Sequence, residues 1–392
     1  MAGRLFYYLS ERSIDMRGPI TYSFRSLIKL KNTGAVPGAA LDALREEADK
    51  IMTRHTLCVT MQKIPAASGD PHDYMSVGRY WWPNPETSDG LPYINRDGVV
   101  NPDTQDENLF DRLAHRIHVL ALAAFYFEDR AYSDYAARQL YDWFLNPETY
   151  MNPTARYAQA IPGISDGRGC GLIDFAVSYW VFDSIGILEE MGCLPEATAS
   201  GIREWYVKLT DWMLTHENGL EEDNMLNNHG IWYDAQILAA AVFTDRPQLA
   251  KKICTTAYTR RLRAQIEPDG SQPKELARTK GMNYSLYNLE ALMLIAVLAE
   301  RMGYTQYWEP DPDRGVCILK SAVDFLYPYV KEPKRFPYQE LEPQNAAPRI
   351  AQMLLRLDGY FGGQGYGEKA AELMDDAMRW RMEPIEIWGA DR

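Results

Sequence analysis

The segment Leu113–Phe125 reads LAHRIHVLALAAF and has the length and apolar spacing of an amphipathic helix. On both sides of it, apolar runs of helical length follow one another, and the joints between them contain Pro, Gly, Asn or Asp. Strand-like alternation is nearly absent. The sequence therefore predicts an all-α protein with helices at residues 39–54, 105–127, 131–145, 171–191, 196–215, 230–243, 247–266, 284–302, 316–329, 346–358 and 367–379.

Short joints between successive helices favour stacked antiparallel helix pairs. A ring of such pairs accommodates a chain of 392 residues in one domain, and no fixed sequence period indicates an open solenoid. We predict an α/α toroid, an incomplete barrel of antiparallel helix pairs, over residues 39–392. Residues 1–38 form an N-terminal extension without an assigned structure.

The overall charge excludes some partners. The chain carries 41 Lys+Arg against 54 Asp+Glu, a net charge of -13, which argues against nucleic acid because phosphate binding needs a large positive surface. No stretch reaches the ~20 consecutive apolar residues of a membrane helix, and the opening MAGRLFYYLSERS lacks the apolar run of a secretory signal. We expect no membrane partner and no signal peptide in this chain.

One segment reverses the acidic balance. Residues 246–280 hold three acids, Glu267, Asp269 and Glu275, and nine basic residues: Arg246, Lys251, Lys252, Arg260, Arg261, Arg263, Lys274, Arg278 and Lys280. The local charge is therefore +6, and we expect this segment to lead positive charge into a site for a polyanion.

Neither cysteine nor histidine spacing indicates a metal site. The five cysteines lie far apart without a CxxC pair, which predicts free thiols. His115 and His118 form an H-x-x-H, but no third ligand is near and the run is a helix face. We expect no metal and no cofactor.

An irregular segment at about residues 60–103 is too long for an ordinary connection, so it is a candidate for substrate contacts. It contains HDYMSVGRYWWPNP (72–85), in which Tyr80, Trp81 and Trp82 are consecutive aromatic residues. Their flat faces suit stacking on sugar rings. The alternative is that Trp81 and Trp82 plug one end of the toroid.

A second polar segment, NNHGIWYDAQ (227–236), leads into an apolar helix. Asn227, Asn228 and His229 stand at the positive end of that helix, where a carboxylate is stabilised. The alternative is an N-cap, which explains one Asn but not the whole polar run.

The third segment, KELARTKGMNYSLY (274–287), also runs into a helix. The planar fork of Arg278 suits a carboxylate, and Tyr284 offers a phenol near the same helix start. The alternative is that Arg278 pairs with Glu275 and that Tyr284 and Tyr287 are core residues.

These residue types favour β-elimination of a uronic acid polysaccharide. Neutralising the substrate carboxylate makes the adjacent C5 proton acidic, a base removes that proton, and an acid protonates the departing O4. When proton and leaving oxygen lie on one face of the sugar, one Tyr serves both steps. A glycosidase needs two flanking carboxyl groups, and Asp223 and Asp234 keep that option open.

Four blocks carry a family resemblance: HDYMSVGRYWWPNP, DGRGCGLIDF (166–175), NNHGIWYDAQ and KELARTKGMNYSLYNLEAL (274–292). Together they resemble the alginate lyase superfamily, the α/α-toroid lyases of polysaccharide lyase families five and thirty-eight. The resemblance runs from about residue 39 to 380. It implies that Asn228 and Arg278 neutralise the substrate carboxylate, that His229 acts as base or further neutraliser, and that Tyr284 is the acid and the base.

The stretch between Arg278 and Tyr284 departs from the pattern of family five and matches family thirty-eight better, so Tyr287 stays an alternative to Tyr284. The resemblance also implies sugar subsites at matching positions. The predicted substrate-binding residues are Tyr80, Trp81, Trp82, Arg168, Trp232, Tyr233, Gln236, Lys274 and Tyr287.

The predicted function is a lyase for a 1,4-linked uronan. Mannuronate and glucuronate share configuration at C4 and C5, so poly-mannuronate comes first and glucuronan second, whereas guluronate needs a base on the other face. The alternatives are a toroidal glycoside hydrolase and a non-catalytic carbohydrate-binding toroid. The resemblance suggests a periplasmic or secreted enzyme, and the sequence does not predict an oligomeric state.

Overall fold

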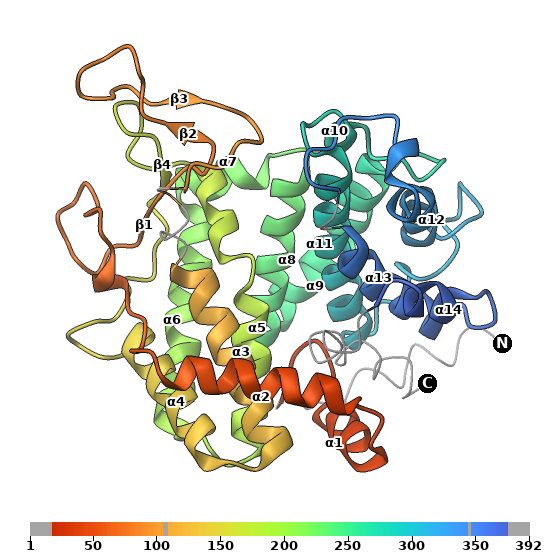
Figure 1. Cartoon of the computed structure of the whole chain (residues 1–392), viewed down its shortest axis with the longest axis horizontal. Coiled ribbons are helices and arrows are strands. Elements are labelled where there is room, and N and C mark those ends of the chain that lie inside the picture. Colours follow the sequence, from red (N-terminus) through yellow and green to blue (C-terminus); the bar gives the residue numbers. More distant parts are fainter. Residues whose placement is uncertain (1–17, 103, 105–108, 344–345, 375–392) are drawn as a thin grey trace.

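The apolar helices of the chain stand side by side as the inner wall of an α/α toroid (Figure 1). The computed structural model describes residues 18–102, 104, 109–343 and 346–374. Along the wall, each inner helix packs on the next. The inner helices are α3 (Leu109–Phe127), α5 (Ser178–Glu190), α8 (Asn228–Phe243), α11 (Gly281–Arg301) and α13 (Ala346–Tyr360).

A second layer of helices packs outside this wall. Its members are α2 (Gly38–Met52), α4 (Arg130–Phe144), α6 (Glu196–Thr215), α9 (Pro247–Ala257), α12 (Ile318–Lys331) and α14 (Tyr366–Ala371). The sequence explains the two layers. Every residue of α8 from Gly230 to Phe243 is buried, as expected for a helix that is apolar all round, whereas α9 buries one stripe containing Ala250, Ile253 and Cys254.

Short strands and loops cover one end of the toroid (Figure 1, upper left). β1 (Met75–Val77) pairs in parallel with β4 (Tyr157–Ala160), and β2 (Trp81–Trp82) pairs antiparallel with β3 (Ile94–Asn95). The β2–β3 hairpin belongs to the irregular segment that the sequence marks for substrate contacts. It lies at the same end of the toroid as the starts of α8 and α11.

The helix predicted at 367–379 corresponds to α14, which ends at Ala371, and residues 372–374 are not helical. The other predicted helices match the observed ones closely, with two differences of form. The run 171–191 divides into the 3-10 helix η3 (Gly169–Phe175) and α5, and the run 247–266 continues from α9 into the π-helical η4 (Tyr258–Arg263). In η3, a Cβ on Gly171 would lie 2.4 Å from the carbonyl oxygen of Ala158, so the chain passes too close to β4 for a side chain. The predicted positions 105–108 and 375–379 lie outside the described residues.

The sequence analysis missed several short helices, each of which lacks a long apolar stripe. They are α1 (Phe24–Thr33), α7 (Glu217–Asp223), α10 (Pro273–Leu276), η1 (Val59–Met61) and η5 (Pro333–Arg335).

The segment before α1 is fastened to the inner wall. The carboxylate of Asp183 on α5 accepts hydrogen bonds from the backbone N–H groups of Ile20 and Thr21 at 2.7 and 2.9 Å. Gly186, one turn along, allows this contact, because a Cβ there would lie 2.1 Å from the carbonyl carbon of Gly18. The start of the described chain is therefore tied to α5 of the toroid wall.

Two helical segments, Gly169–Glu190 and Gly281–Arg301, are long and apolar enough to cross a membrane. Inside the fold, 72% and 78% of their apolar windows are buried, which is the pattern of core helices. Their apolar character is therefore accounted for by the toroid wall.

Candidate active site

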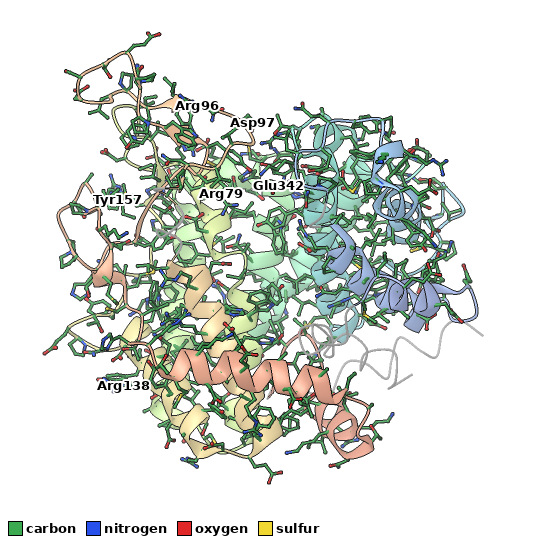
Figure 2. All side chains as sticks on the ribbon, viewed as in Figure 1. Arg79, Arg96, Asp97, Arg138, Tyr157 and Glu342 are labelled. Carbon is green, nitrogen blue, oxygen red and sulfur yellow. The ribbon has the colours of Figure 1, made fainter. Side chains whose placement is uncertain are left out.

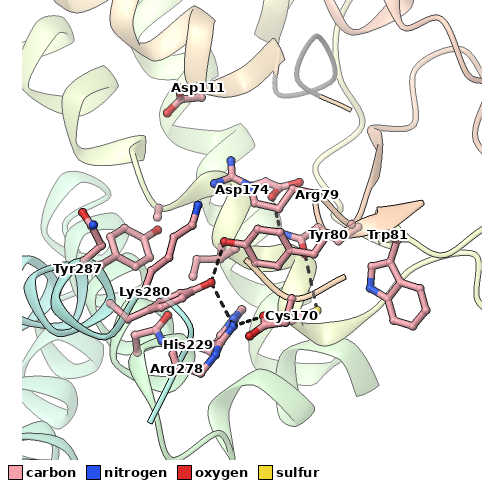
Figure 3. Close-up of a pocket in the computed structure, with 18 of the residues that line it drawn as sticks. Arg79, Tyr80, Trp81, Asp111, Cys170, Asp174, His229, Arg278, Lys280 and Tyr287 are labelled. Carbon is pink, nitrogen blue, oxygen red and sulfur yellow. Dashed lines mark hydrogen bonds and ion pairs between the residues drawn. The ribbon is translucent and has the colours of Figure 1, made fainter. Parts of the chain in front are cut away.

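A cavity of about 570 Å³ lies where the hairpin faces the starts of α8 and α11. In Figure 3, Tyr80 and Trp81 enter it from one side, and Lys280 and Tyr287 from the opposite side, with His229 and Arg278 below them. Segments far apart in the sequence thus meet around one space. Of the predicted site residues, those lining the cavity are Tyr80, Trp81, Arg168, Asn228, His229, Arg278, Tyr284 and Tyr287.

Tyr284 and Arg278 form the centre of the site. Nη2 of Arg278 donates to the phenolic oxygen of Tyr284 at 3.1 Å, and the guanidinium carbon lies 4.1 Å from the centre of the Tyr284 ring. The hydroxyl of Tyr80 lies 2.8 Å from that of Tyr284. Arg278 also contacts Asp97 of the hairpin at 2.9 Å, so the alternative pairing of Arg278 with Glu275 is not what holds it.

Burial raises the pKa of Tyr284 well above its ordinary value, and the neighbouring Tyr80 raises it further. The positive charge of Arg278 acts in the opposite direction and lowers it. The phenol therefore keeps its proton at neutral pH, and Arg278 is the group that favours the phenolate.

Asn228 is oriented by a buried carboxylate. The backbone N–H and the side-chain Nδ2 of Asn228 each donate to Glu275 at 2.7 Å, and burial raises the pKa of Glu275. The N-cap of α8 is Asn227, whose Oδ1 accepts from the N–H of His229 at 3.1 Å. The carboxylate expected at this helix start is thus supplied by the protein itself, while Asn228 keeps a second amide N–H.

The ring of His229 is fixed by Glu222 on α7. Nδ1 of His229 lies 2.7 Å from Oε1 of Glu222, whose side chain is 1% exposed. Because a carboxylate only accepts, the proton of a neutral ring belongs on Nδ1, which leaves Nε2 as an acceptor. Glu222 lies seven residues before His229, and the sequence analysis did not assign it a role.

Trp81 and Arg168 form a wall of the cavity that depends on Gly78. The Arg168 guanidinium lies 5.9 Å from the centre of the Trp81 ring and is held by its Nε hydrogen bond to the Gln159 carbonyl at 2.8 Å. A Cβ on Gly78 would come within 2.6 Å of Trp81 and 2.7 Å of Arg168. The absence of a side chain at Gly78 allows both groups to face the cavity.

The remaining predicted substrate-binding residues lie elsewhere: Trp82, Trp232, Tyr233, Gln236 and Lys274. The indole N–H of Trp82 donates to the Val99 carbonyl within the hairpin. Trp232 and Tyr233 are buried in α8, and Gln236 donates to a backbone carbonyl of its own helix. Lys274 is exposed on α10.

Several lining residues were not predicted: Arg79, Asn95, Asp97, Asp111, Gln159, Asp174, Lys280, Asn283, Glu342 and Arg349. Figure 2 shows Arg79, Asp97 and Glu342 at the upper rim, between the hairpin and the α10 side. Arg79 and Lys280 lie inside the quoted motifs and could have been found there. Glu342 contacts Lys280 at 2.7 Å, but its isolated position in the sequence gives no signal.

Most cations that line the cavity do not come from the basic segment 246–280. Of the nine basic residues in 246–280, only Arg278 and Lys280 line it. Arg260, Arg261 and Arg263 instead form ion pairs in the second layer. The other cations of the cavity come from separate segments: Arg79, Arg168 and Arg349.

Asp223 and Asp234, the two acids considered for a glycoside hydrolase, are paired with arginines. Asp234 is 1% exposed and contacts Nε of Arg261 at 2.8 Å, and Asp223 contacts Arg260. Neither lines the cavity. These two carboxylates therefore do not flank a substrate bound there.

Within the described ranges, no group of three or more His, Cys, Asp or Glu side chains is placed to hold a metal ion. His118 stacks on Trp180 with ring centres 5.7 Å apart, and His115 contacts Glu47 at 3.5 Å. All five cysteines are free thiols. The H-x-x-H pair is therefore part of the packing between helices.

The chain is similar to known proteins in sequence and in fold. A solved alginate lyase from Bacteroides ovatus is 33% identical, with a TM-score of 0.88 over 94% of this chain and 99% of that one. The apo form of a histidine variant of alginate lyase A1-III shares the fold, with 16% identity and a TM-score of 0.54 over 95% and 96% of the two chains.

Among curated sequences, an alginate lyase of Pseudomonas syringae pv. syringae is 30% identical over 148 residues. These residues are 37% of this chain and 36% of that protein, so the alignment spans about a third of the relative. The alginate lyase family itself matches residues 58–336. The chain belongs to the alginate lyase family.

Proposed function

We propose that the protein is a polysaccharide lyase that cleaves a 1,4-linked uronan by β-elimination. The observation that carries the proposal is the contact between the Tyr284 phenol and the Arg278 guanidinium at 3.1 Å. β-Elimination needs a proton-transferring group beside a group that neutralises a carboxylate, because the C5 proton lies next to the substrate carboxyl group. The membership of the alginate lyase family supports the same reaction.

In the proposed reaction, Arg278 and the free amide N–H of Asn228 bind the substrate carboxylate. The phenolate oxygen of Tyr284 takes the C5 proton, a double bond forms between C4 and C5, and the C4–O4 bond breaks. O4 leaves with the proton that Tyr284 has received, which restores the phenolate. The phenol first releases its own proton to solvent. Arg278 favours the resulting phenolate and in part opposes the burial that raises the pKa of Tyr284.

His229 has the second role at the carboxylate. With Nδ1 directed to Glu222, the imidazolium form of His229 neutralises the substrate carboxylate through Nε2–H, and the neutral form serves as the base for the C5 epimer. Five cations and four acidic residues line the cavity, and the cation beside Tyr284, Arg278, suits a substrate carboxylate. We propose poly-mannuronate as the first substrate and glucuronan as the second, since both present C4 and C5 in the configuration that a single Tyr serves.

The experiment that tests the proposal is a panel assay of the purified protein on poly-mannuronate, poly-guluronate and glucuronan. A lyase produces an unsaturated sugar, so ultraviolet absorbance rises in step with the number of new reducing ends. We expect this on poly-mannuronate first. New reducing ends without absorbance would indicate a hydrolase, and binding without either signal would indicate a carbohydrate-binding toroid.

A further inference from the structure

A second cavity of about 380 Å³ adjoins the first and lies deeper inside the toroid. The two cavities share Ala176, Val177, Tyr287 and Arg349 as lining residues, so these four form the boundary between them. Figure 3 labels Tyr287, on the same side of the first cavity as Lys280. The volume falls within the ~300–1,000 Å³ of ordinary small-molecule sites.

The lining of this inner chamber contains polar atoms that are buried without a hydrogen-bond partner among the described residues. They are the Tyr22 hydroxyl, Nδ1 of His118, the indole Nε1 of Trp232 and Nη1 of Arg356. Tyr22, His118 and Trp232 are 1%, 8% and 3% exposed. Buried polar groups nearly always have partners, so four unpaired ones around one cavity mark it as a candidate binding site.

The chemistry of these atoms limits the ligand. Trp232 and Arg356 donate only, while the Tyr22 hydroxyl and the His118 ring can donate or accept. Arg356 makes no ion pair within the described part of the chain, unlike Arg349, which contacts Glu290 at 2.6 Å. A ligand that matches this set carries acceptor oxygens and one negative charge.

Burial lowers the pKa of Arg356 to about 10, so its guanidinium is charged at neutral pH, and burial lowers the pKa of His118 to about 3, so its ring is neutral. The other charged groups of the lining already have partners: Asp183 accepts from Ile20 and Thr21, and Glu290 pairs with Arg349. The chamber thus presents one cation that no carboxylate contacts.

Aromatic and apolar side chains form the rest of the lining. Trp180 stacks on His118, and Trp232 lies 4.9 Å from Tyr287 between ring centres. Flat faces of this kind cover the less polar face of a sugar ring. Met293, Leu294 and Met353 complete the wall.

We propose that the inner chamber is a binding site for a single uronic acid residue in monomeric form, with its carboxylate on Arg356 and its ring between the aromatic side chains. Trp232 and Tyr22 donate to its remaining oxygens. This site is separate from the cavity of Tyr284 and Arg278. The inference does not need the proposed lyase reaction, because binding to the chamber is measured with a monomer that no lyase cleaves.

The test is isothermal titration of the full chain with sodium D-glucuronate, with D-glucose as the uncharged control and sodium acetate as a carboxylate without a ring. We expect saturable binding of glucuronate and at least tenfold weaker binding of both controls. The variant Arg356→Gln loses at least tenfold in affinity for glucuronate. Its rate of polymer cleavage stays within about twofold, since Arg356 does not line the catalytic cavity.

A second variant, Tyr22→Phe, removes one hydroxyl and keeps the ring in the core, so it tests the site if Arg356→Gln fails to fold. We expect it to weaken glucuronate binding several-fold. Equal affinity of the wild type and both variants would place the bound monomer elsewhere and overturn the proposal. No saturable binding of glucuronate, or equal binding of D-glucose, would also overturn it.

Discussion

Nη2 of Arg278 and the phenolic oxygen of Tyr284 lie 3.1 Å apart in the cavity, with the guanidinium over the face of the same ring. Asp97, on the hairpin side of the cavity, accepts from Arg278 at 2.9 Å and so helps to hold the pair in place. The two groups that the proposed reaction needs therefore keep their relative position before substrate binds. Charged groups that are positioned before the reaction lower its barrier, because they do not have to reorganise in the transition state.

Glu222 is expected to act through His229. In Glu222→Gln an amide can donate to Nδ1 as well as accept from it, so the ring loses its preference for the tautomer with Nε2 free. We predict a fall in kcat of roughly tenfold or more, with KM changed little. Steady-state kinetics on poly-mannuronate measure this.

The matched control is Glu217→Gln, an exposed acid in the first turn of the same helix α7. We expect wild-type kinetics from it. An effect of Glu217→Gln as large as that of Glu222→Gln would reduce the role of Glu222 to the stability of α7.

Gly78 is expected to control sugar binding. In Gly78→Ala the new methyl group meets Trp81 and Arg168 at distances that force both side chains to move. We predict a several-fold rise in KM for the polymer with a smaller change in kcat, because Tyr284 and Arg278 do not contact Gly78. Gly38→Ala, at the exposed start of α2 with no atom near the new Cβ, serves as the control. An unchanged KM in Gly78→Ala would remove Trp81 and Arg168 from the binding site.

Asp183 is expected to make stability depend on pH. Burial raises its pKa to about 6 from the ordinary 3.8, so between these values the folded protein holds a proton that the unfolded chain releases. The free energy of unfolding therefore falls as pH rises from about 4 to 6, by about 3 kcal/mol from this group.

Asp183→Asn removes the titration and can keep the contacts, since its oxygen still accepts from Ile20 and Thr21. We predict that denaturant unfolding at pH 4 and pH 6.5 shows the variant gaining stability relative to wild type at the higher pH. A difference between variant and wild type that is the same at both pH values would contradict the assignment.

The helices and much of the site are predictable from the sequence because their signals are local. Helical periodicity places α6 and α8, and the motif around Asn228 and His229 is contiguous. Contacts between distant segments are not predictable in this way. The pairing of Arg278 with Asp97 joins residues 181 positions apart, and only the fold brings them together.

Burial in α8 explains why Trp232, Tyr233 and Gln236 do not line the cavity. In the run after His229, the helical period turns Tyr233 toward the outer layer, where its hydroxyl donates to the Met213 carbonyl at 3.0 Å. A polar or aromatic residue beside a motif is therefore a site residue only if its helix face points to the cavity. The positive charge of residues 246–280 likewise does not all reach the cavity, since Arg261 is buried against Asp234.

The measurement that tests the central claim most directly compares Tyr284→Phe with Tyr287→Phe on poly-mannuronate. Each variant loses one hydroxyl and keeps its ring, so formation of the unsaturated product and polymer binding are measured separately. The account predicts that Tyr284→Phe lowers the rate of the absorbance rise by at least ~100-fold with polymer binding largely intact, while Tyr287→Phe remains active. Full activity in Tyr284→Phe together with loss of activity in Tyr287→Phe would contradict it.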